Sequence, residues 1–284
     1  MLCTSCGVLV GVNDDTCYNC GRRNPGLWGF APALRSLGND MGFVPFVIGT
    51  CVILYALTLV VTVAQGGSLF GGSLFGMLSP GGVATFLFGS SGKFPVIDAG
   101  RWWTLLSAGW LHGSALHILF NMSVVRQMAP IAADLYGPGR MVIIYTAGSV
   151  AGFAASTLAG LFLTGLPWFL SAGTRSVGAS ASIAGLIAAI LYYGNRGGSG
   201  MARQYASSYI LMLVFIGLFL PNVDNYGHLG GFGGGYLMAR YLDPLKPERI
   251  DHIAIAVVCL AASLLAIVVS VIHGLPILRA QGLL

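Results

Sequence analysis

Four polar side chains lie inside or at the edge of long apolar stretches of this 284-residue chain: His117, Asn121, Ser180 and His228. A strongly polar side chain within a membrane span is energetically costly, so such residues mark candidate functional sites. A hydroxyl, two imidazoles and a carboxamide are the groups that acyl transfer uses as nucleophile, proton acceptor and oxyanion donors. The combination predicts a serine-hydrolase site within a membrane domain.

Ser180 lies in the segment TRSVGASASIAGLIAAI, where we expect a loop to enter a helix two residues after Gly178. At such a place the free amides of the first helical turn surround a serine hydroxyl and can donate hydrogen bonds to an anion. Ser180 is therefore the candidate nucleophile. Two alternatives remain open: Ser182 offers a second hydroxyl, and a serine at a helix start often serves only as an N-cap.

His228 opens the segment HLGGFGGGY, in which Gly231 and Gly235 recur at helical spacing. Glycines at this spacing give a helix a smooth face that another helix can approach closely. We expect this face to bring the His228 imidazole to Ser180, where it can accept the serine proton and return it to the leaving amine. Asp224, four residues earlier, is a candidate third member of the site, although an N-cap role is favoured.

His117 and Asn121 stand four residues apart in LHGSALHILFNM, so one helical face presents both side chains. Both can donate hydrogen bonds, which suits them to a developing oxyanion. The alternative is hydrogen bonding between helices of the bundle, a common use of polar residues in membranes.

The composition excludes a soluble globular domain, because 56% of the residues are hydrophobic and only 8% are charged. Apolar runs long enough to span a bilayer recur along the chain, together with two shorter or glycine-interrupted runs. We therefore predict an all-α, polytopic membrane protein with seven transmembrane helices. The expected helices cover residues 43–65, 104–129, 141–165, 178–194, 205–221, 227–242 and 252–273.

An excess of lysine and arginine marks the cytoplasmic side of a membrane protein. With seven spans and a cytoplasmic N-terminus, ten of the 14 Lys and Arg residues fall at or near the cytoplasmic side, and four fall outside: Lys93, Arg101, Arg175 and Arg279. We therefore expect a cytoplasmic N-terminus, an external C-terminus and a location in a bacterial inner membrane. The net charge of +5 then reflects topology and contact with membrane lipids, and indicates no nucleic-acid partner.

Two Cys-x-x-Cys pairs lie near the N-terminus, and each is followed by a glycine. Four thiolates suit one tetrahedral Zn²⁺ and leave no open position for catalysis. Two disulfides are the alternative, but a cytoplasmic N-terminus places these thiols in a reducing compartment. We expect residues 1–21 to form a zinc-ribbon-like module that needs its structural metal to fold. The expected ligands are Cys3, Cys6, Cys17 and Cys20.

Two further segments are predicted to contain no spanning helix. Residues 22–42 hold two prolines and four glycines and form the expected juxtamembrane linker. Residues 66–100 are apolar but broken by glycines, and GGSLF occurs in them twice. Because irregular backbone is not tolerated in contact with lipid chains, we expect this segment to lie in the membrane interface or to pack on protein.

Taken together, HILFN with His117 and Asn121, GAS with Ser180, and DNYGHLGG with His228 resemble the rhomboid family of intramembrane serine proteases. The resemblance covers residues 43–242, which would form a six-helix membrane domain. Residues 243–284 would add a seventh transmembrane helix and a short tail, the six-plus-one form of the family.

By this resemblance Ser180 is the nucleophile and His228 the general base, working as a dyad with no catalytic cofactor. His117, Asn121 and the Ser180 amide would form the oxyanion hole. The substrate would be the transmembrane helix of another protein. It would have to unwind first, because each carbonyl inside a helix is bonded to the amide four residues later.

Three positions depart from the usual family pattern. The first loop usually carries Trp-Arg, whereas here Arg101 precedes Trp103. Ala133, beside Asp134, stands where a glutamate often ends the second helix. Ala184 stands where an aromatic side chain commonly packs on the histidine, so we expect lower activity unless another aromatic side chain takes that role. The candidates are Tyr226 and Phe232.

Three other functions compete with proteolysis. A rhomboid-like protein that binds or escorts membrane clients without cutting them would not need Ser180. Short glycine-interrupted helices suggest a transporter, but we find no internal helix repeat and no buried acidic or basic residue suited to ion coupling. A metalloprotease is disfavoured because His112 and His117 have the wrong spacing for two ligands on one helix face, and HExxH is absent.

Overall fold

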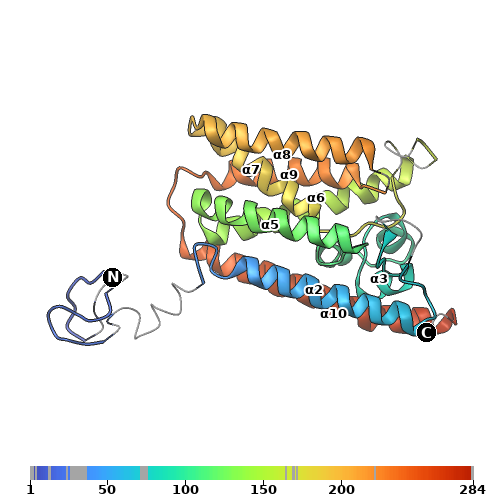
Figure 1. Cartoon of the computed structure of the whole chain (residues 1–284), viewed down its shortest axis with the longest axis horizontal. Helices are drawn as coiled ribbons and strands as arrows, with labels where there is room; N and C mark the ends of the chain where they lie inside the picture. The colour runs from blue at the N-terminus through green and yellow to red at the C-terminus, as the bar shows by residue number, and fades with distance from the viewer. Residues whose placement is uncertain are drawn as a thin grey trace.

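The computed structural model describes residues 3, 5–11, 14–23, 25, 37–70, 76–163, 165–167, 170, 172–220 and 222–282. Within these residues the protein is all-helical and contains no strand, as predicted (Figure 1). Each of its seven long helices has 17 or more residues. They are α2 (Phe43–Ala64), α5 (Ala115–Tyr136), α6 (Pro138–Phe162), α7 (Ser180–Arg196), α8 (Gly200–Phe219), α9 (Asn225–Leu242) and α10 (Ile250–Ala280).

Short helical pieces fill the segment between α2 and α5. They are α3 (Gly82–Phe88), the π-helix η3 (Lys93–Asp98), α4 (Thr104–Ser107) and the 3₁₀-helix η4 (Ala108–Trp110). α3 packs against α2 and α10, and its residues 84–87 are buried. The α3 part of 66–100 therefore packs on protein, one of the two expected placements, whereas Phe70 is 78% exposed. Residues 71–75 lie outside the described residues, as do 24 and 26–36 of the predicted linker.

The predicted helix over 104–129 is wrong in its first part. The chain breaks after η4, and α5 begins only at Ala115. The cause is local: Ser114 is extended, and its hydroxyl caps α5 by accepting a hydrogen bond from the His117 amide at 3.3 Å. A run of apolar residues has the same hydropathy whether or not it contains this break. The other six predicted helices are present with shifted ends.

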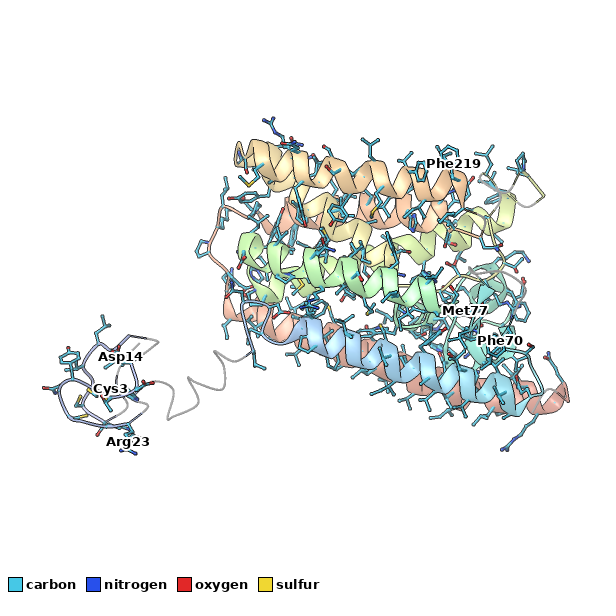
Figure 2. The ribbon with its side chains drawn as sticks, in the orientation of Figure 1. Cys3, Asp14, Arg23, Phe70, Met77 and Phe219 are labelled. Carbon is cyan, nitrogen blue, oxygen red and sulfur yellow. The ribbon has the colours of Figure 1, made fainter. Side chains whose placement is uncertain are left out.

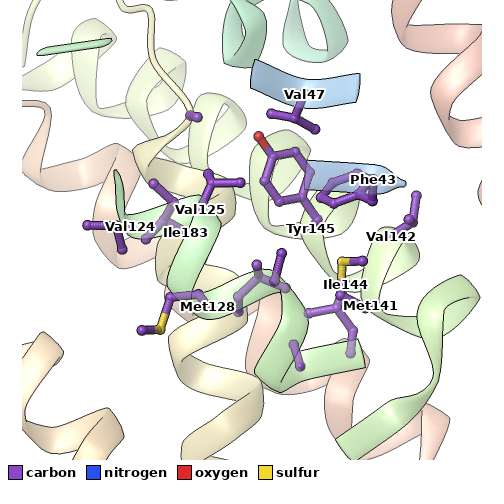
Figure 3. Packing of buried hydrophobic residues seen from close by; sticks show 14 of the residues in the cluster. Phe43, Val47, Val124, Val125, Met128, Met141, Val142, Ile144, Tyr145 and Ile183 are labelled. Atoms are coloured by element: carbon purple, nitrogen blue, oxygen red, sulfur yellow. The ribbon is translucent and has the colours of Figure 1, made fainter. Parts of the chain in front are cut away.

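α6 lies at the centre of the helix bundle. In its most apolar stretch 67% of the residues are buried, compared with 11% for α8. Figure 3 shows Tyr145 of α6 against Phe43 and Val47 of α2. The rings of Tyr145 and Phe43 meet edge to face, with centroids 5.1 Å apart. This contact fixes α2 on the core, because aromatic pairs of this geometry add to the gain from packing alone.

Glycines let α6, α7 and α9 approach each other at backbone distance. A Cβ added to Gly148 of α6 would lie 3.1 Å from the Gly185 Cα of α7. A Cβ on Gly235 of α9 would overlap the Gly185 backbone, and one on Gly231 would overlap the Ala181 carbonyl. The smooth face predicted for 227–242 is thus used for close contact with α7.

The outer surface of the helices is apolar. α2, α6, α8 and α10 are long and apolar enough to cross a bilayer by length and composition. Figure 2 shows side chains projecting outward along the helices, and Phe219 at the end of α8 is 65% exposed. This surface suits contact with lipid; a seven-span topology with a cytoplasmic N-terminus remains a prediction.

Gly235→Ala should lower the free energy of unfolding by about 1–3 kcal/mol. The added methyl group would overlap the Gly185 backbone of α7, and backbone cannot move aside as easily as a side chain. Gly233→Ala on the same helix is the matched control, since a Cβ there meets nothing within 4 Å. It should leave stability unchanged or raise it by up to about 1 kcal/mol, the difference in helix propensity. Thermal unfolding in detergent measures both, and equal midpoints for the two variants would contradict the close helix contact.

Candidate functional site

Ser180 is the first residue of α7, and Ala179 is the N-cap. The Ser180 hydroxyl is therefore not needed as a cap. The first hydrogen bond of the helix joins the Ile183 amide to the Ala179 carbonyl at 2.9 Å, so the preceding amides have no acceptor within α7. Ser180 is half-buried, so a reactant that reaches its hydroxyl also meets free amide donors.

The competing serine differs in its surroundings. Ser182 is fully buried, and its hydroxyl lies beside that of Tyr145 in the core of the bundle. A nucleophile must contact its substrate, so burial against α6 disfavours Ser182 and favours Ser180.

His117 and Asn121 lie on one face of α5, as their spacing predicted, and the structure places both next to Gly178. The Gly113 amide donates to His117 Nδ1 at 3.3 Å, so this nitrogen is the acceptor and the neutral ring carries its proton on Nε2. A Cβ on Gly178 would lie 2.7 Å from His117 Nε2 and 3.8 Å from Asn121 Nδ2. Asn121 Nδ2 is buried without a partner in the described chain. His117 Nε2 and the unpartnered Asn121 Nδ2 therefore both lie beside Gly178.

Gly178 is held in a conformation that favours glycine. Its φ is +132°, and its amide donates to the Ala108 carbonyl of η4 at 3.0 Å. Any side chain here would fill the space in front of the two donors. The loop before Ser180 is thus fixed from the segment that precedes α5, which sequence patterns did not reveal.

His228 lies in the first turn of α9, next to Gly227. A Cβ on Gly152 of α6 would lie 2.5 Å from the Gly227 carbonyl and 2.6 Å from the Ala181 Cβ. The neighbours of His228 and Ser180 therefore meet at the same point of α6, and this brings the first turns of α7 and α9 together. The His228 ring is also close enough to His117 for electrostatic interaction.

Asp224 is the N-cap of α9, the role that the sequence favoured. Its Oδ1 accepts from the Gly227 amide at 2.8 Å, and its Oδ2 accepts a short hydrogen bond from the Ser176 hydroxyl. His228 Nδ1 is buried and has no hydrogen-bond partner among the described residues. The carboxylate therefore ties the loop before Ser180 to the helix that carries His228.

The structure adds His112 to this site, a histidine that was weighed on sequence grounds only as a metal ligand. His112 is fully buried, and its ring meets that of His117 edge to face, with centroids 5.2 Å apart. Neither His112 nitrogen has a partner in the described part of the chain. The HGSALH pattern was the available signal, but only the break before α5 brings the two rings together.

The positions that depart from the expected pattern have other partners. Asp134, at the end of α5, accepts from Asn39 Nδ2 at 2.7 Å and so fixes the start of α2. Tyr226 donates its hydroxyl to the Leu170 carbonyl at 2.9 Å. Ala184 is fully buried. Arg101 and Trp103 both contact Ser270 of α10.

The four cysteines near the N-terminus form one cluster, with sulfur atoms all within 4.8 Å of one another. The Cys3–Cys20 and Cys6–Cys17 sulfur distances are 3.8 and 3.6 Å, and all four thiols are free. These distances exceed a disulfide bond of about 2.0 Å. A tetrahedron with Zn–S bonds of about 2.3 Å has edges of about 3.8 Å, so the thiols fit one zinc ion.

The backbone around the cysteines has the expected turns. Gly7 and Gly21 have φ values of +72° and +71°, and their amides donate to the Cys3 and Cys17 carbonyls at 2.9 Å. Backbone amides, that of Cys6 foremost, bond the Cys3 sulfur and lower the pKa of its thiol. These amides therefore favour the thiolate of Cys3, which is the form that binds metal.

Comparison with known proteins agrees with this architecture. The model of the rhomboid domain matches residues 99–244, which hold all four polar residues of the membrane site. The chain therefore belongs to the rhomboid family and has its helical membrane fold.

Named relatives include proteases. The chain is 29% identical over 170 residues to Rhomboid protease GluP of Bacillus subtilis, a match that covers 59% of this chain and 31% of that protein. It is 33% identical over 153 residues to RHOMBOID-like protein 7 of Arabidopsis thaliana, covering 49% and 42%. It is 25% identical over 149 residues to Rhomboid-like protease 3 of Toxoplasma gondii, covering 52% and 54%. The chain spans roughly a third to a half of these relatives' lengths.

Cys17→Ser should remove bound zinc, because it deletes one of the four thiolate ligands. Metal binding and folding are coupled in so small a module, so the weaker site should also fold less well. The wild-type protein should retain about one zinc per chain after gel filtration with a weak chelator, as measured by elemental analysis. Cys259→Ser is the matched control, since Cys259 lies in α10 away from the cluster. Equal zinc content in all three proteins would contradict a four-cysteine site.

Proposed function

We propose that this protein is an intramembrane serine protease that hydrolyses peptide bonds in or near the transmembrane segments of other membrane proteins. The observation that carries the proposal is the meeting of the first turns of α7 and α9. The half-buried Ser180 and the His228 imidazole belong to these first turns, and His117 Nε2 and the unpartnered Asn121 Nδ2 lie next to Gly178, two residues before Ser180.

In the proposed reaction His228 takes the proton of the Ser180 hydroxyl as its oxygen attacks the substrate carbonyl. The negative charge that develops on the carbonyl oxygen is stabilised by the Ser180 amide, His117 Nε2–H and Asn121 Nδ2–H. His228 then gives its proton to the leaving amine. Water, activated by the same imidazole, hydrolyses the acyl-enzyme and restores the serine.

A dyad fits the contacts better than a triad. In a triad an acidic residue accepts from the Nδ1–H of the base and orients the ring. Here His228 Nδ1 has no hydrogen-bond partner among the described residues, and the Asp224 oxygens accept from the Gly227 amide and the Ser176 hydroxyl instead. Asp224 therefore acts on the site through helix α9 and the preceding loop, and the helix packing orients His228.

The arrangement also suits a substrate that arrives as a membrane helix. The carbonyls of a helix are bonded within it, so a transmembrane segment must unwind before Ser180 can attack. Glycine or polar residues near the outer end of the substrate lower the cost of unwinding. Membrane proteins with such segments are therefore the proposed substrates.

The remaining parts of the proposal concern placement. We infer that the membrane domain covers residues 43–242, with 243–284 as an added helix and tail, and that the N-terminus is cytoplasmic in a bacterial inner membrane. The zinc module of residues 1–21 is inferred to be structural, and catalysis needs no metal. The excess of basic residues on one side supports this orientation.

Ser180→Ala and His228→Ala should each lower cleavage by at least about 10⁴-fold, because neither half of the dyad acts alone. Asn121→Ala should cost about 10²-fold, since other oxyanion donors remain. The measurement is cleavage of a model transmembrane substrate with glycine near its outer end, in proteoliposomes. Ser182→Ala is the matched serine control and should keep its activity. Binding without cleavage by both wild type and Ser180→Ala would instead support an escort protein.

Asp224→Asn separates the dyad from a triad. Asparagine is as good an N-cap as aspartate, so this variant should keep activity within several-fold of wild type. Asp224→Ala loses the cap, about 1 kcal/mol of stability, and should lower activity more. A fall of about 10⁴-fold in kcat for Asp224→Asn, as when a triad aspartate is lost, would contradict the dyad.

A further inference from the structure

α10, the last helix, contacts the segment between α2 and α5 through a buried cation. Arg101 is fully buried; its Nη1 donates to the Phe86 carbonyl at 2.7 Å, and its Nη2 donates to the Ser270 carbonyl at 2.8 Å. The guanidinium carbon also lies 4.0 Å from the centre of the Phe86 ring. A buried charge is tolerated only with such partners, so the contact constrains both α3 and α10.

Ser270 makes a second contact with the same segment. It is fully buried, and its hydroxyl accepts from Trp103 Nε1 at 3.1 Å. A side chain on Gly89 would overlap the hydroxyls of both Ser270 and Ser107, and Ser107 donates to the Gly89 carbonyl at 2.8 Å. One serine of α10 thus lies against three parts of the segment.

These contacts are one short helix away from the proposed active site. Arg101 and Trp103 precede α4, and Thr104 Oγ1 holds the start of that helix by donating to the Arg101 carbonyl at 2.7 Å. α4 continues directly into η4, whose Ala108 carbonyl accepts from the Gly178 amide. A continuous series of contacts therefore leads from Ser270 through Trp103, α4 and η4 to Gly178, beside the oxyanion donors.

The other end of α10 is also fixed by polar contacts. Glu248 Oε1 accepts from the Arg140 amide at 2.8 Å, at the start of α6. The Arg140 guanidinium donates to three carbonyls at the end of α9 and in the connection that follows: those of Leu242, Asp243 and Lys246. Figure 1 shows α10 running the length of the bundle, and it packs on α6, α3 and α4. A helix held at both ends can act as a fixed support.

We propose that Ser270 is a positioning residue: through Trp103 and α4 it holds the Ala108 carbonyl so that the Gly178 amide, and with it the loop before Ser180, stays in place. α10 is then part of the catalytic framework and not only an added anchor. This inference rests on the proposed function for its effect on catalysis, whereas its structural part is independent of activity.

The test compares Ser270→Ala with Ser263→Ala on the full chain in proteoliposomes. Ser263 is the matched control: it is buried in the same helix, but its hydroxyl bonds the Cys259 carbonyl of its own helix. Ser270→Ala should raise amide hydrogen exchange in residues 172–180 about fivefold, as expected for losing one neutral hydrogen bond. It should lower kcat by a similar factor with little change in KM, and Ser263→Ala should alter neither.

A second variant, which removes the other partner of the same hydrogen bond, distinguishes loss of this contact from general destabilisation of the fold. Trp103→Phe keeps the aromatic packing but removes the donor, so it should reproduce the effect of Ser270→Ala, and the double variant should be no worse than either single one. Additive effects, or exchange in Ser270→Ala equal to that in Ser263→Ala, would overturn the inference even if wild type cleaves. Raised exchange without any cleavage by wild type would support the positioning contact and reject the proposed protease.

Discussion

Backbone contact between α6, α7 and α9 at their glycines is the constraint on which the other features depend. Apolar side chains gain little by leaving lipid for a protein interior, so helices in a membrane associate through close packing and polar contacts. Gly148 and Gly152 of α6 provide that packing for both partners. Because α7 and α9 each begin near this contact, their first turns meet, and the helix starts supply free amides and a capped end in one place.

Polar contacts then hold in place the first turns of α7 and α9, which the glycines bring together. Asp224 caps α9 and also holds Ser176, so one carboxylate sets the distance between a helix and the loop that precedes the other helix. At the two ends of α10, Arg101 and Arg140 donate to main-chain carbonyls. Hydrogen bonds from a cation to several carbonyls are strong in apolar surroundings, where an unpaired charge would be costly.

The sequence was sufficient for the residues whose signal is local. The spacing of His117 and Asn121, the glycines of α9 and the paired cysteines each follow from short-range geometry, and the structure places them as expected. The break before α5 was missed because hydropathy does not distinguish one apolar helix from two. The rings of His112 and His117 meet only because the chain breaks before α5, so the short pattern alone did not reveal their contact. The contact between Arg101 and Ser270 joins residues 169 positions apart, and no short pattern encodes such a pairing.

The separation of Arg101 and Ser270 along the chain also means that the two residues are synthesised at different times. The two residues are 169 positions apart, and at about 5–20 residues per second their synthesis is separated by about 10–30 s. Throughout that interval the guanidinium lacks its acceptor on α10, and the segment that holds Gly178 lacks the support that α10 gives it. On the proposed function, a growing chain therefore reaches its full hydrolytic rate only after α10 has inserted and packed on this segment.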